Sequence, residues 1–314
     1  MSGYGIGAGG LIGVAFETTV GTYVAPTKFV PILSETLEYK EQNNYRRPIR
    51  QSAAQIGVVP GDFDIEGTIT MEATEDTCLY FTEVSRAVGV KSGSTPNWVY
   101  TYTPTSVAVP PRTLSITVVR NGVVFGYTGC CTTKQTFTVN NNVLEYQADI
   151  IGLSEATQSA PGSVVWPTSV PYGPGSWSVQ IPSPTAVTDM DTFSFDIDDA
   201  GAAQYRLKNA KGAQFVAYGE RSIQMTASRD FLDKTDYGLF QSVAGQKLTV
   251  LTTAGANNSI QFDVFNGIKD VYQVPLSGQG DLIRASITYQ STLDASGNEY
   301  DIIYKTQETI TPHT

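Results

Sequence analysis

Histidine is almost absent from this 314-residue sequence, because the one histidine is His313, next to the last residue. A catalytic serine or cysteine that depends on a histidine base, and a metal site built on imidazoles, therefore lack the residue they need. Asp196, Asp198 and Asp199 faintly match a calcium-binding loop, but no glutamate follows at the required spacing. We expect no enzymatic activity, no cofactor and no bound metal.

Cysteine and long apolar runs are also scarce. Cys130 and Cys131 are adjacent and Cys78 is the third, so these residues cannot form a disulfide framework. No apolar run reaches membrane-spanning length, and the first lysine is Lys28, so no basic segment precedes an apolar one at the start. The sequence predicts a protein of the cytoplasm, used without a cleaved secretory signal and without a membrane partner.

Charged residues are few as well. They make up 16% of the chain, and the formal net charge is −10. An average soluble domain has about 25% charged residues. The shortage has two interpretations: other subunits cover much of the surface, or the surface is a Thr/Ser-rich β surface. The acidic balance argues against binding nucleic acid through its phosphates, but not against lying beside it.

Strand patterns dominate what is present, so we expect a mainly β fold. Asn121-Gly122 lies between two Val-rich and Thr-rich runs, which predicts a hairpin with a type I′ turn. The segment "DFDIEGTITME", residues 62–72, alternates polar and apolar positions, as a strand with one buried face does. Glu220 opens a similar strand in the second half.

Two short helices are predicted, at residues 74–89 and 230–245. Thr74 and Asp230 are the N-cap candidates, and Gly89 and Gly245 the stops.

The order of elements around each helix is the same, which indicates an internal repeat. Each helix follows an alternating strand and precedes a β-rich run and a closing strand. Phe240 corresponds to Phe81 and Leu248 to Leu114, and the two offsets differ by an insertion in the first half.

We therefore divide the chain into two tandem β domains, each with one helix. The predicted parts are a flexible N-terminal arm (residues 1–30), a first domain (31–157) with an inserted segment at about 89–111, a linker (158–176), and a second domain with a C-terminal tail (177–314). Within the arm, Gly5, Gly7 and Gly10 match a dinucleotide-binding pattern. No strand precedes them and no helix follows, so we interpret them as flexible chain.

Two basic loops occupy matching places in the repeat. They are either solvated or meet acidic surface on a neighbouring subunit. Their residues are Arg46, Arg47 and Arg50 in the first half, and Arg206, Lys208 and Lys211 in the second.

The run "GVAFETTVGTYVAPTKFVP", residues 13–31, resembles the opening of tail tube proteins from long-tailed bacteriophages. Phe16 stands where relatives often have a polar residue. The matching residues are Gly13, Val14, Ala15, Glu17, Thr18, Thr19, Gly21, Thr22, Ala25, Pro26, Thr27, Phe29 and Pro31.

The resemblance implies a structural virion protein, the major tail tube subunit of a siphophage-type, non-contractile tail. In that family each domain is a β-sandwich flanked by a helix, and domains join edge to edge into a barrel around a DNA channel. Single-domain relatives form hexamers, so two domains per chain imply trimeric rings with pseudo-sixfold symmetry, with a hexamer as the alternative. The rings stack into a helical tube, in which long loops and terminal arms contact the adjacent ring.

The same resemblance implies the partners. Tape-measure protein and viral DNA pass through the lumen without sequence-specific binding, and tail terminator and distal tail proteins bind the tube, which is assembled in the host bacterial cytoplasm. An acidic strand face would keep DNA off the wall, although the same face could lie on the exterior. The candidate residues for this face are Asp62, Asp64, Glu66, Glu72 and Glu220.

Two other functions remain open. A tail terminator or baseplate protein would form one closed ring and no tube. A carbohydrate-binding module of a receptor-recognition protein would expose aromatic side chains, and Trp98, Tyr100 and Tyr102 are the candidates, although such a run more often marks a packed hairpin.

Overall fold

The structure is a computed structural model that describes residues 9–47, 54–55, 57–110, 112–140, 143–158, 160–173, 175–207, 211–231, 234–276, 278 and 281–313. Within these ranges the chain forms 21 strands and two short helices, which confirms the mainly β fold. Neither helix is long and apolar enough to cross a membrane.

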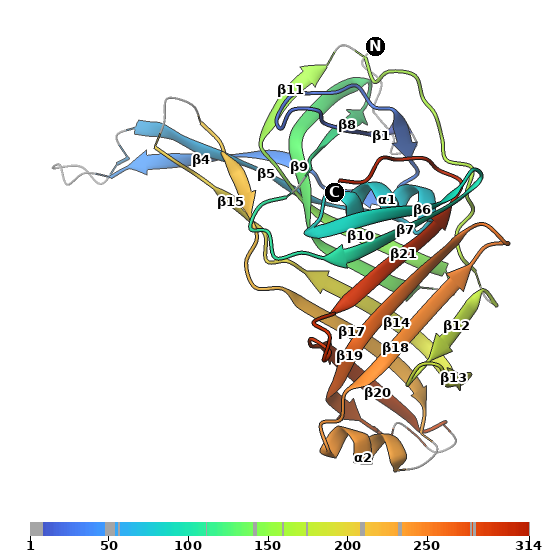
Figure 1. The fold of residues 1–314 in the computed structure, drawn as a ribbon. Coiled ribbons are helices and arrows are strands. Elements are labelled where there is room, and N and C mark those ends of the chain that lie inside the picture. The colour runs from blue at the N-terminus through green and yellow to red at the C-terminus, as the bar shows by residue number, and fades with distance from the viewer. Residues whose placement is uncertain are drawn as a thin grey trace.

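The first half of the chain forms the upper part of the molecule in Figure 1. Its elements are β1 (Leu11–Phe16), β2 (Lys28–Val30), β3 (Ser34–Glu35), β4 (Glu38–Arg46), β5 (Gly57–Glu72), α1 (Glu75–Glu83), β6 (Ala87–Ser94), β7 (Asn97–Pro104), β8 (Leu114–Arg120), β9 (Val123–Asn140), β10 (Val143–Gly152) and β11 (Ser154–Gln158).

The second half forms the lower part, with α2 at its end (Figure 1). Its elements are β12 (Trp177–Gln180), β13 (Ala186–Val187), β14 (Met190–Asp198), β15 (Ala202–Gln204), β16 (Phe215–Ala217), β17 (Ser222–Asp230), α2 (Thr235–Gln241), β18 (Gln246–Thr253), β19 (Ser259–Gln273), β20 (Arg284–Ser291) and β21 (Tyr300–Thr306).

The two halves have the same strand order. In the first half, neighbouring strands run β2, β1, β8, β9, β10, β5 and then β3 with β4, all antiparallel. In the second half they run β13, β12, β18, β19, β20, β17 and β14. In addition, β11 pairs with β9 as β21 pairs with β19. The domain boundaries themselves stay a prediction.

The bulges of the two halves also correspond. Ile116 lies opposite Tyr127, and Leu248 opposite Val264, each next to a bulge in the ladder. The structure thus aligns Leu248 with Ile116, two positions from the predicted partner Leu114. The difference arises because β-bulges set the register of the β8–β9 and β18–β19 ladders, and the sequence composition does not show where bulges lie.

The inserted segment of the first half is the β6–β7 hairpin. β7 pairs with β21, so the insertion adds strands to the sheet of the second half.

The N-terminal arm differs from the expectation over residues 11–30. β1 lies between β2 and β8 in the sheet, and Ile12 and Val14 are completely buried. Burying these apolar side chains stabilises the fold, whereas a mobile arm would leave them in water. Gly5 and Gly7 lie outside the described residues.

The helix predictions were right in position, and Thr74 is the N-cap residue of α1 as predicted, but the other three helix ends differ from the prediction. α1 follows Thr74, whose hydroxyl pairs with that of Thr77 instead of capping a backbone N–H. α2 follows Lys234, because Asp230 is the last residue of β17. Gly89 lies within β6, where an added Cβ would come within 2.7 Å of the Tyr102 ring.

The predicted hairpin at Asn121-Gly122 is confirmed. The two residues connect β8 and β9 with positive φ angles of 49° and 79°, as a type I′ turn requires.

Candidate functional site: the polar face of an eight-strand sheet

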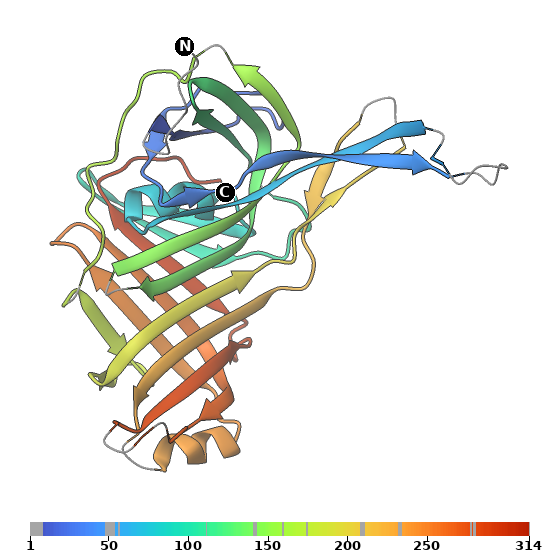
Figure 2. The same cartoon turned by 180° about the vertical axis from the view of Figure 1, so that it is seen from behind.

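Eight strands form one continuous antiparallel sheet that crosses both halves. The order is β3, β5, β10, β9, β14, β17, β20 and β19, with β4 beside β5 where β3 ends. The halves meet at the β9–β14 pairing, in which Phe137 lies opposite Phe195. Seen from behind, the strands run as one slanted series from the first half into the second (Figure 2).

One face of this sheet is apolar and lies on the core. One row of its residues crosses six strands in register, and each side chain is at most 1% exposed. The row consists of Met71, Tyr146, Phe137, Phe195, Met225 and Tyr289.

The opposite face, which we call the polar face, carries hydroxyl, amide and carboxylate side chains that are half-buried or exposed. Three rows define it. They are Glu72, Glu145, Thr138, Ser194, Thr226 and Thr288; Thr70, Gln147, Thr136, Asp196, Gln224 and Gln290; and Thr68, Asp149, Lys134, Asp198 and Ser222.

The polar face is acidic. Among these three rows Lys134 is the single cation, against the five carboxylates of Glu72, Glu145, Asp149, Asp196 and Asp198. Neighbouring hydroxyls hold some of the carboxylates in place: Thr68 donates to Asp149 at 2.9 Å, and Thr136 donates to Asp196 at 2.7 Å. The face therefore presents oxygen atoms with little capacity to attract phosphate.

Of the acidic residues that the sequence singled out, Glu72 lies on the polar face. Asp62, Asp64 and Glu66 lie toward the projecting part of β5, and Glu220 precedes β17. Glu145 and Asp149 were not among the predicted residues, although the sequence of β10 alternates polar and apolar positions from Leu144 to Ile150. That alternation was the available signal.

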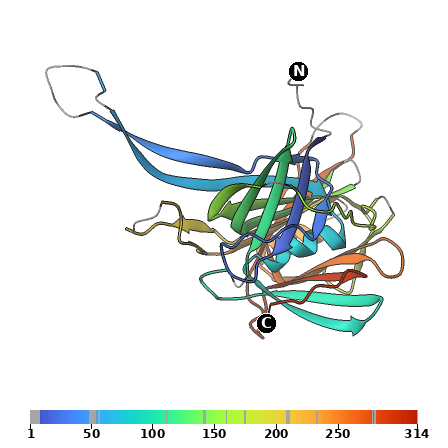
Figure 3. The ribbon, with the colours of Figure 1, turned by 90° about the horizontal axis from the view of Figure 1, so that it is seen from above.

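The projecting β4–β5 hairpin extends far from the body of the molecule (Figure 3). The loop of the second half that contains β15 and β16 lies against it. Tyr205 donates to Asp64, the Gly212 N–H donates to Asp62 at 3.1 Å, and Lys211 pairs with Glu41 at 3.0 Å.

The predicted basic residues are thus divided. Arg46 ends β4 and Arg47 follows it, Arg206 lies over the Phe215 ring, and Lys211 is paired within the chain. Arg50 and Lys208 lie outside the described residues.

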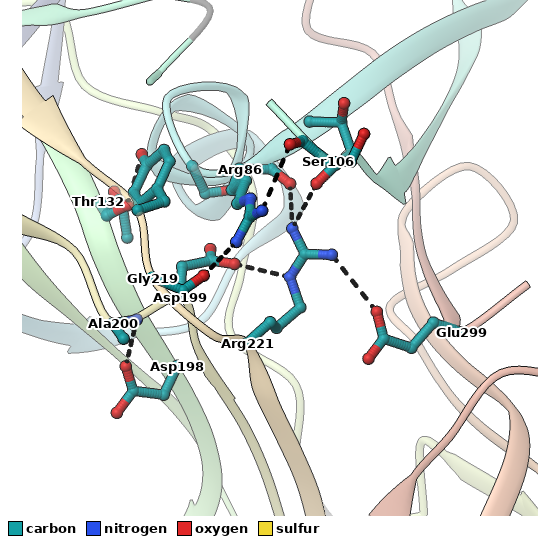
Figure 4. A network of polar contacts seen from close by, with 12 residues as sticks. Arg86, Ser106, Thr132, Asp198, Asp199, Ala200, Gly219, Arg221 and Glu299 are labelled. Atoms are coloured by element: carbon teal, nitrogen blue, oxygen red, sulfur yellow. Dashed lines mark hydrogen bonds and ion pairs between the residues drawn. The ribbon is translucent and has the colours of Figure 1, made fainter. Parts of the chain in front are cut away.

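A buried arginine ties the two halves together (Figure 4). Arg221 Nε donates to Asp199 Oδ1 at 2.7 Å, and its other nitrogens reach the carbonyl oxygens of Arg86 and Thr105 at 2.7 and 3.0 Å and the Glu299 carboxylate at 3.3 Å. Burial raises the pKa of Asp199, while Arg221 opposes that shift. Through its bonds to the carbonyl oxygens of Arg86 and Thr105, Arg221 holds the second half against the first-half segment that follows α1.

α1 carries buried acids. Glu75 accepts hydrogen bonds from Ser169 at 2.6 Å and Tyr172 at 2.5 Å, and Glu83 accepts one from Tyr102 at 2.8 Å. Burial raises the pKa of both glutamates. Ser169 and Tyr172 belong to the predicted linker, which is therefore packed against α1.

Other site chemistries find no support among the described residues. No group of His, Cys, Asp or Glu there could hold a metal ion, and Asp199 of the faint calcium pattern pairs with Arg221 instead. All three cysteines are buried, and burial raises the pKa of Cys131 to about 12.

Two of the three aromatic residues proposed for sugar binding are packed inside, and Trp98 is half-buried. Tyr100 and Tyr102 are completely buried, and the Trp98 ring lies under Lys91 Nζ at 3.8 Å. Since a sugar stacks on an open aromatic face, these residues form no such platform.

Comparison with known proteins identifies the family. A family model described as phage tail tube protein matches residues 7–291. No curated protein matches the chain. Because the match spans nearly the whole sequence and agrees with the mainly β structure, this chain belongs to the phage tail tube protein family, whose members are structural virion components that assemble with other tube subunits.

Proposed function

We propose that the chain forms the tube of a non-contractile phage tail by assembling into rings of three copies, which stack helically. The observation that carries this proposal is the repeated strand order, which places four strands of each half in one sheet. Three copies then supply six four-strand units, as many as a ring of six single-domain chains. Three eight-strand sheets would close a barrel of 24 strands.

The polar face lines the channel in this proposal. The apolar face is already covered by the core, so the polar face is the side of the sheet that is left for water. Its carboxylates repel DNA phosphates, and screening limits this repulsion to about 8 Å at physiological salt. Glu72 belongs to this lining, and Asp62, Asp64, Glu66 and Glu220 continue it toward the rim of the ring.

The β4–β5 hairpin contacts the adjacent ring. Every side chain of β4, Tyr45 included, is exposed, and so are Val58 and Val59 of β5 near the tip. A long exposed hairpin with apolar side chains is an aggregation hazard in a free subunit, which a neighbouring ring would remove. Arg46 and Arg47 are placed to meet that ring, and the same role for Arg50 stays a prediction from the sequence.

The described part of the second basic loop, with Arg206 and Lys211, supports the hairpin from the same chain, and a role of Lys208 stays a prediction. Lys211 already pairs with Glu41, and Tyr205 with Asp64.

The assembled tube is strongly acidic. Each chain has a formal charge of −10, so a ring of three carries −30. Buried apolar area between subunits and the basic hairpin residues must offset this self-repulsion. Tape-measure protein and DNA pass through the channel without specific binding, terminator and distal tail proteins close its ends, and assembly takes place in the host cytoplasm.

Electron microscopy of the purified chain tests the assembly. In a concentration series at physiological salt we expect open-ended tubes with a central channel. Closed rings that never stack would favour the terminator or baseplate alternative, and monomers at every concentration would contradict the proposal.

A charge reversal tests the channel lining. In the variant with Asp149→Lys and Asp196→Lys, assembled tubes should bind a short fluorescent DNA duplex that wild-type tubes do not bind. Asp281→Lys, in the loop between β19 and β20, is the control and adds a lysine outside the sheet. Equal DNA binding by both variants would contradict the assignment of the polar face to the lumen.

A further inference from the structure

The two halves differ at the place where each helix ends beside a bulge in the sheet. Thr133 is the extra residue in the β9–β10 ladder, and Asp270 is the extra residue in the β19–β20 ladder. Aligning the two bulges makes Thr132 equivalent to Lys269. The same place in each half can therefore be compared residue by residue.

The ends of the two helices correspond as well. Phe81 in α1 and Phe240 in α2 match in the repeat, so Val84, three residues after Phe81, is equivalent to Val243. Val84 is the C-cap residue of α1, and Val243 follows α2 by two positions. These two valines mark the same place in the two halves.

In the first half this place is filled by a tyrosine that comes from the second half. Tyr218 follows β16 and is buried, and its hydroxyl donates toward the carbonyl oxygens of Val84 and Thr132, at 3.3 and 3.1 Å. The Tyr218 N–H donates to the carbonyl oxygen of Ala108 at 2.8 Å, so the backbone that carries the ring is also held. The occupant is a phenol side chain whose hydroxyl has two backbone acceptors.

In the second half the same place is an open groove of about 490 Å³. Its apolar part is formed by Phe240, Val243 and Ile268, and its polar part by Asp270, Gln290 and Thr292. Val243 is 63% exposed, whereas Val84 is completely buried. The groove therefore has the room and the mixed lining that suit one aromatic side chain with a hydroxyl group.

The backbone at Val243 is an independent reason to expect an occupant. Its N–H donates to the Phe240 carbonyl at 3.1 Å, and the Ala244 N–H donates to that of Leu239 at 3.3 Å, which is a Schellman ending of the helix. Glycine is usual at the left-handed position of this motif, but here Val243 has a φ of 52°. A β-branched side chain is strained there, and an exposed one gains little from packing within its own chain. Contact with a partner would offset this strain.

We propose that the groove beside α2 binds a tyrosine side chain from β4 of a second copy of this chain. The inference rests on the proposed function, in which the β4–β5 hairpin contacts another copy, and it names the site that receives the hairpin. The phenol ring packs on Phe240, Val243 and Ile268, and its hydroxyl donates to the Val243 or Lys269 carbonyl, as that of Tyr218 does in the first half. Groove and tyrosine are different surfaces, so the contact is heterologous.

β4 is the source because it carries tyrosines that are exposed and far from the body. Tyr45 and Tyr39 are 57% and 41% exposed, and both lie on the projecting hairpin (Figure 3). The third strongly exposed tyrosine among the described residues, Tyr237, belongs to α2 itself. Arg46 follows Tyr45 directly, so a cation arrives together with the ring, and the exposed Asp270 carboxylate of the groove can pair with it.

A free phenol tests the groove without any assembly. The probe is N-acetyl-tyrosinamide, and N-acetyl-leucinamide is the control for general apolar binding. Titrated into the monomeric chain, the tyrosine probe should shift the methyl NMR signals of Val243 and Ile268, and the leucine probe should bind at least tenfold more weakly. Equal shifts with both probes, or none at these two residues, would overturn the phenol site.

Val243→Gly separates the contact from folding. Glycine removes the apolar side chain and also relieves the left-handed strain, so the free chain should unfold about 1–2 °C higher. The same variant should need at least a tenfold higher concentration to assemble. Val90→Ala, at a similarly exposed valine of β6, is the control and should assemble like the wild-type chain. Assembly of Val243→Gly at the wild-type concentration would overturn the proposal.

Photocrosslinking identifies the occupant. With Gln241→p-benzoylphenylalanine at the rim of the groove, irradiation of the assembled chain should join this position to a peptide that contains Tyr39 or Tyr45. In a mixture of isotope-labelled and unlabelled chains, the two joined peptides should come from different copies. Attachment to any other segment, or none in assembled tubes, would overturn the assignment to β4. If the wild-type chain never assembles, the proposed function fails and the second copy fails with it, while the tyrosine probe still decides the phenol site.

Discussion

Phe137 of β9 and Phe195 of β14 lie opposite each other where the two halves meet, and both rings pack against Phe262. The ring centroids are 4.7 Å apart for Phe137 and Phe262, and 5.1 Å apart for Phe195 and Phe262. The joint is therefore built like the interior of one domain, with aromatic side chains from three strands. Two linked but independent domains would meet through a more polar surface.

Truncating Phe137 should destabilise both halves at once. Phe137→Ala is expected to lower the free energy of unfolding by about 3–5 kcal/mol, because a completely buried ring is lost and a cavity remains. Urea denaturation followed by fluorescence should show one transition at lower denaturant. Thr138→Ala, on the polar face, should change the value by less than about 1 kcal/mol. Two separate transitions in the wild-type chain would contradict a shared core.

Removing the arginine of the buried network should be costly. Arg221→Met leaves the Asp199 carboxylate buried without its cation, and we expect a loss of about 3–5 kcal/mol of stability. Adding Asp199→Leu should restore part of this loss, because the Asp199 charge is removed, while Glu299 and the carbonyl oxygens of Arg86 and Thr105 still lack Arg221. Arg284→Met, which breaks a half-exposed pair with Asp191, is the control and should cost about 1 kcal/mol or less. Equal losses for Arg221→Met and Arg284→Met would refute the structural role of the network.

Stability should depend on pH through the buried acids of α1. Burial raises the folded-state pKa of Glu75 and Glu83 above the ordinary 4.5, so the folded chain keeps protons that the unfolded chain has lost. Their stabilising contribution is complete below pH 4.5 and is lost as the pH rises through the raised pKa values. Glu75→Gln should flatten this decline, as measured by urea denaturation at several pH values from 4.5 to neutral. An unchanged slope would contradict the assignment, and Glu38→Gln serves as an exposed control.

Two glycines should respond in opposite ways to alanine. Gly122 has a φ of +79° in the β8–β9 turn, so Gly122→Ala should cost about 1 kcal/mol through backbone strain. Gly238 lies inside α2, and an added Cβ would meet nothing within 4 Å. Gly238→Ala should therefore stabilise the chain by about 0.5–1 kcal/mol. Thermal melts of both variants give the sign of each change in stability. Changes of the same sign would contradict either the positive φ at Gly122 or the helical position of Gly238.

Local features of this fold could be predicted from the sequence, and long-range ones could not. The Asn121-Gly122 turn and the alternating strand at residues 62–72 are encoded by neighbouring residues, and both occur in the structure. β1 was missed because its partner β8 is about a hundred residues away, with Ile12 opposite Val118. The apolar run of β1 is short and lies among glycine and threonine residues, so the sequence did not indicate a strand there. Packing against β8 makes this segment a strand.

The candidate site shows the same limit. The alternation of polar and apolar residues that places Glu72 on one face of β5 can be recognised in the sequence. The same alternation in β10 places Glu145 and Asp149 on one face. That these strands are neighbours, and that Asp196 of the other half continues the row, depends on pairings between distant segments. The contact of Lys211 with Glu41 was hidden for the same reason, since 170 positions separate the two residues.

Electron cryomicroscopy of tubes assembled from the wild-type chain would show how many copies form each ring and which face of the sheet lines the channel. The account predicts three copies in each ring, pseudo-sixfold symmetry of the channel wall, and the polar face of the eight-strand sheet turned toward the channel. Six copies in each ring, or three copies with the polar face turned to the outside, would contradict it.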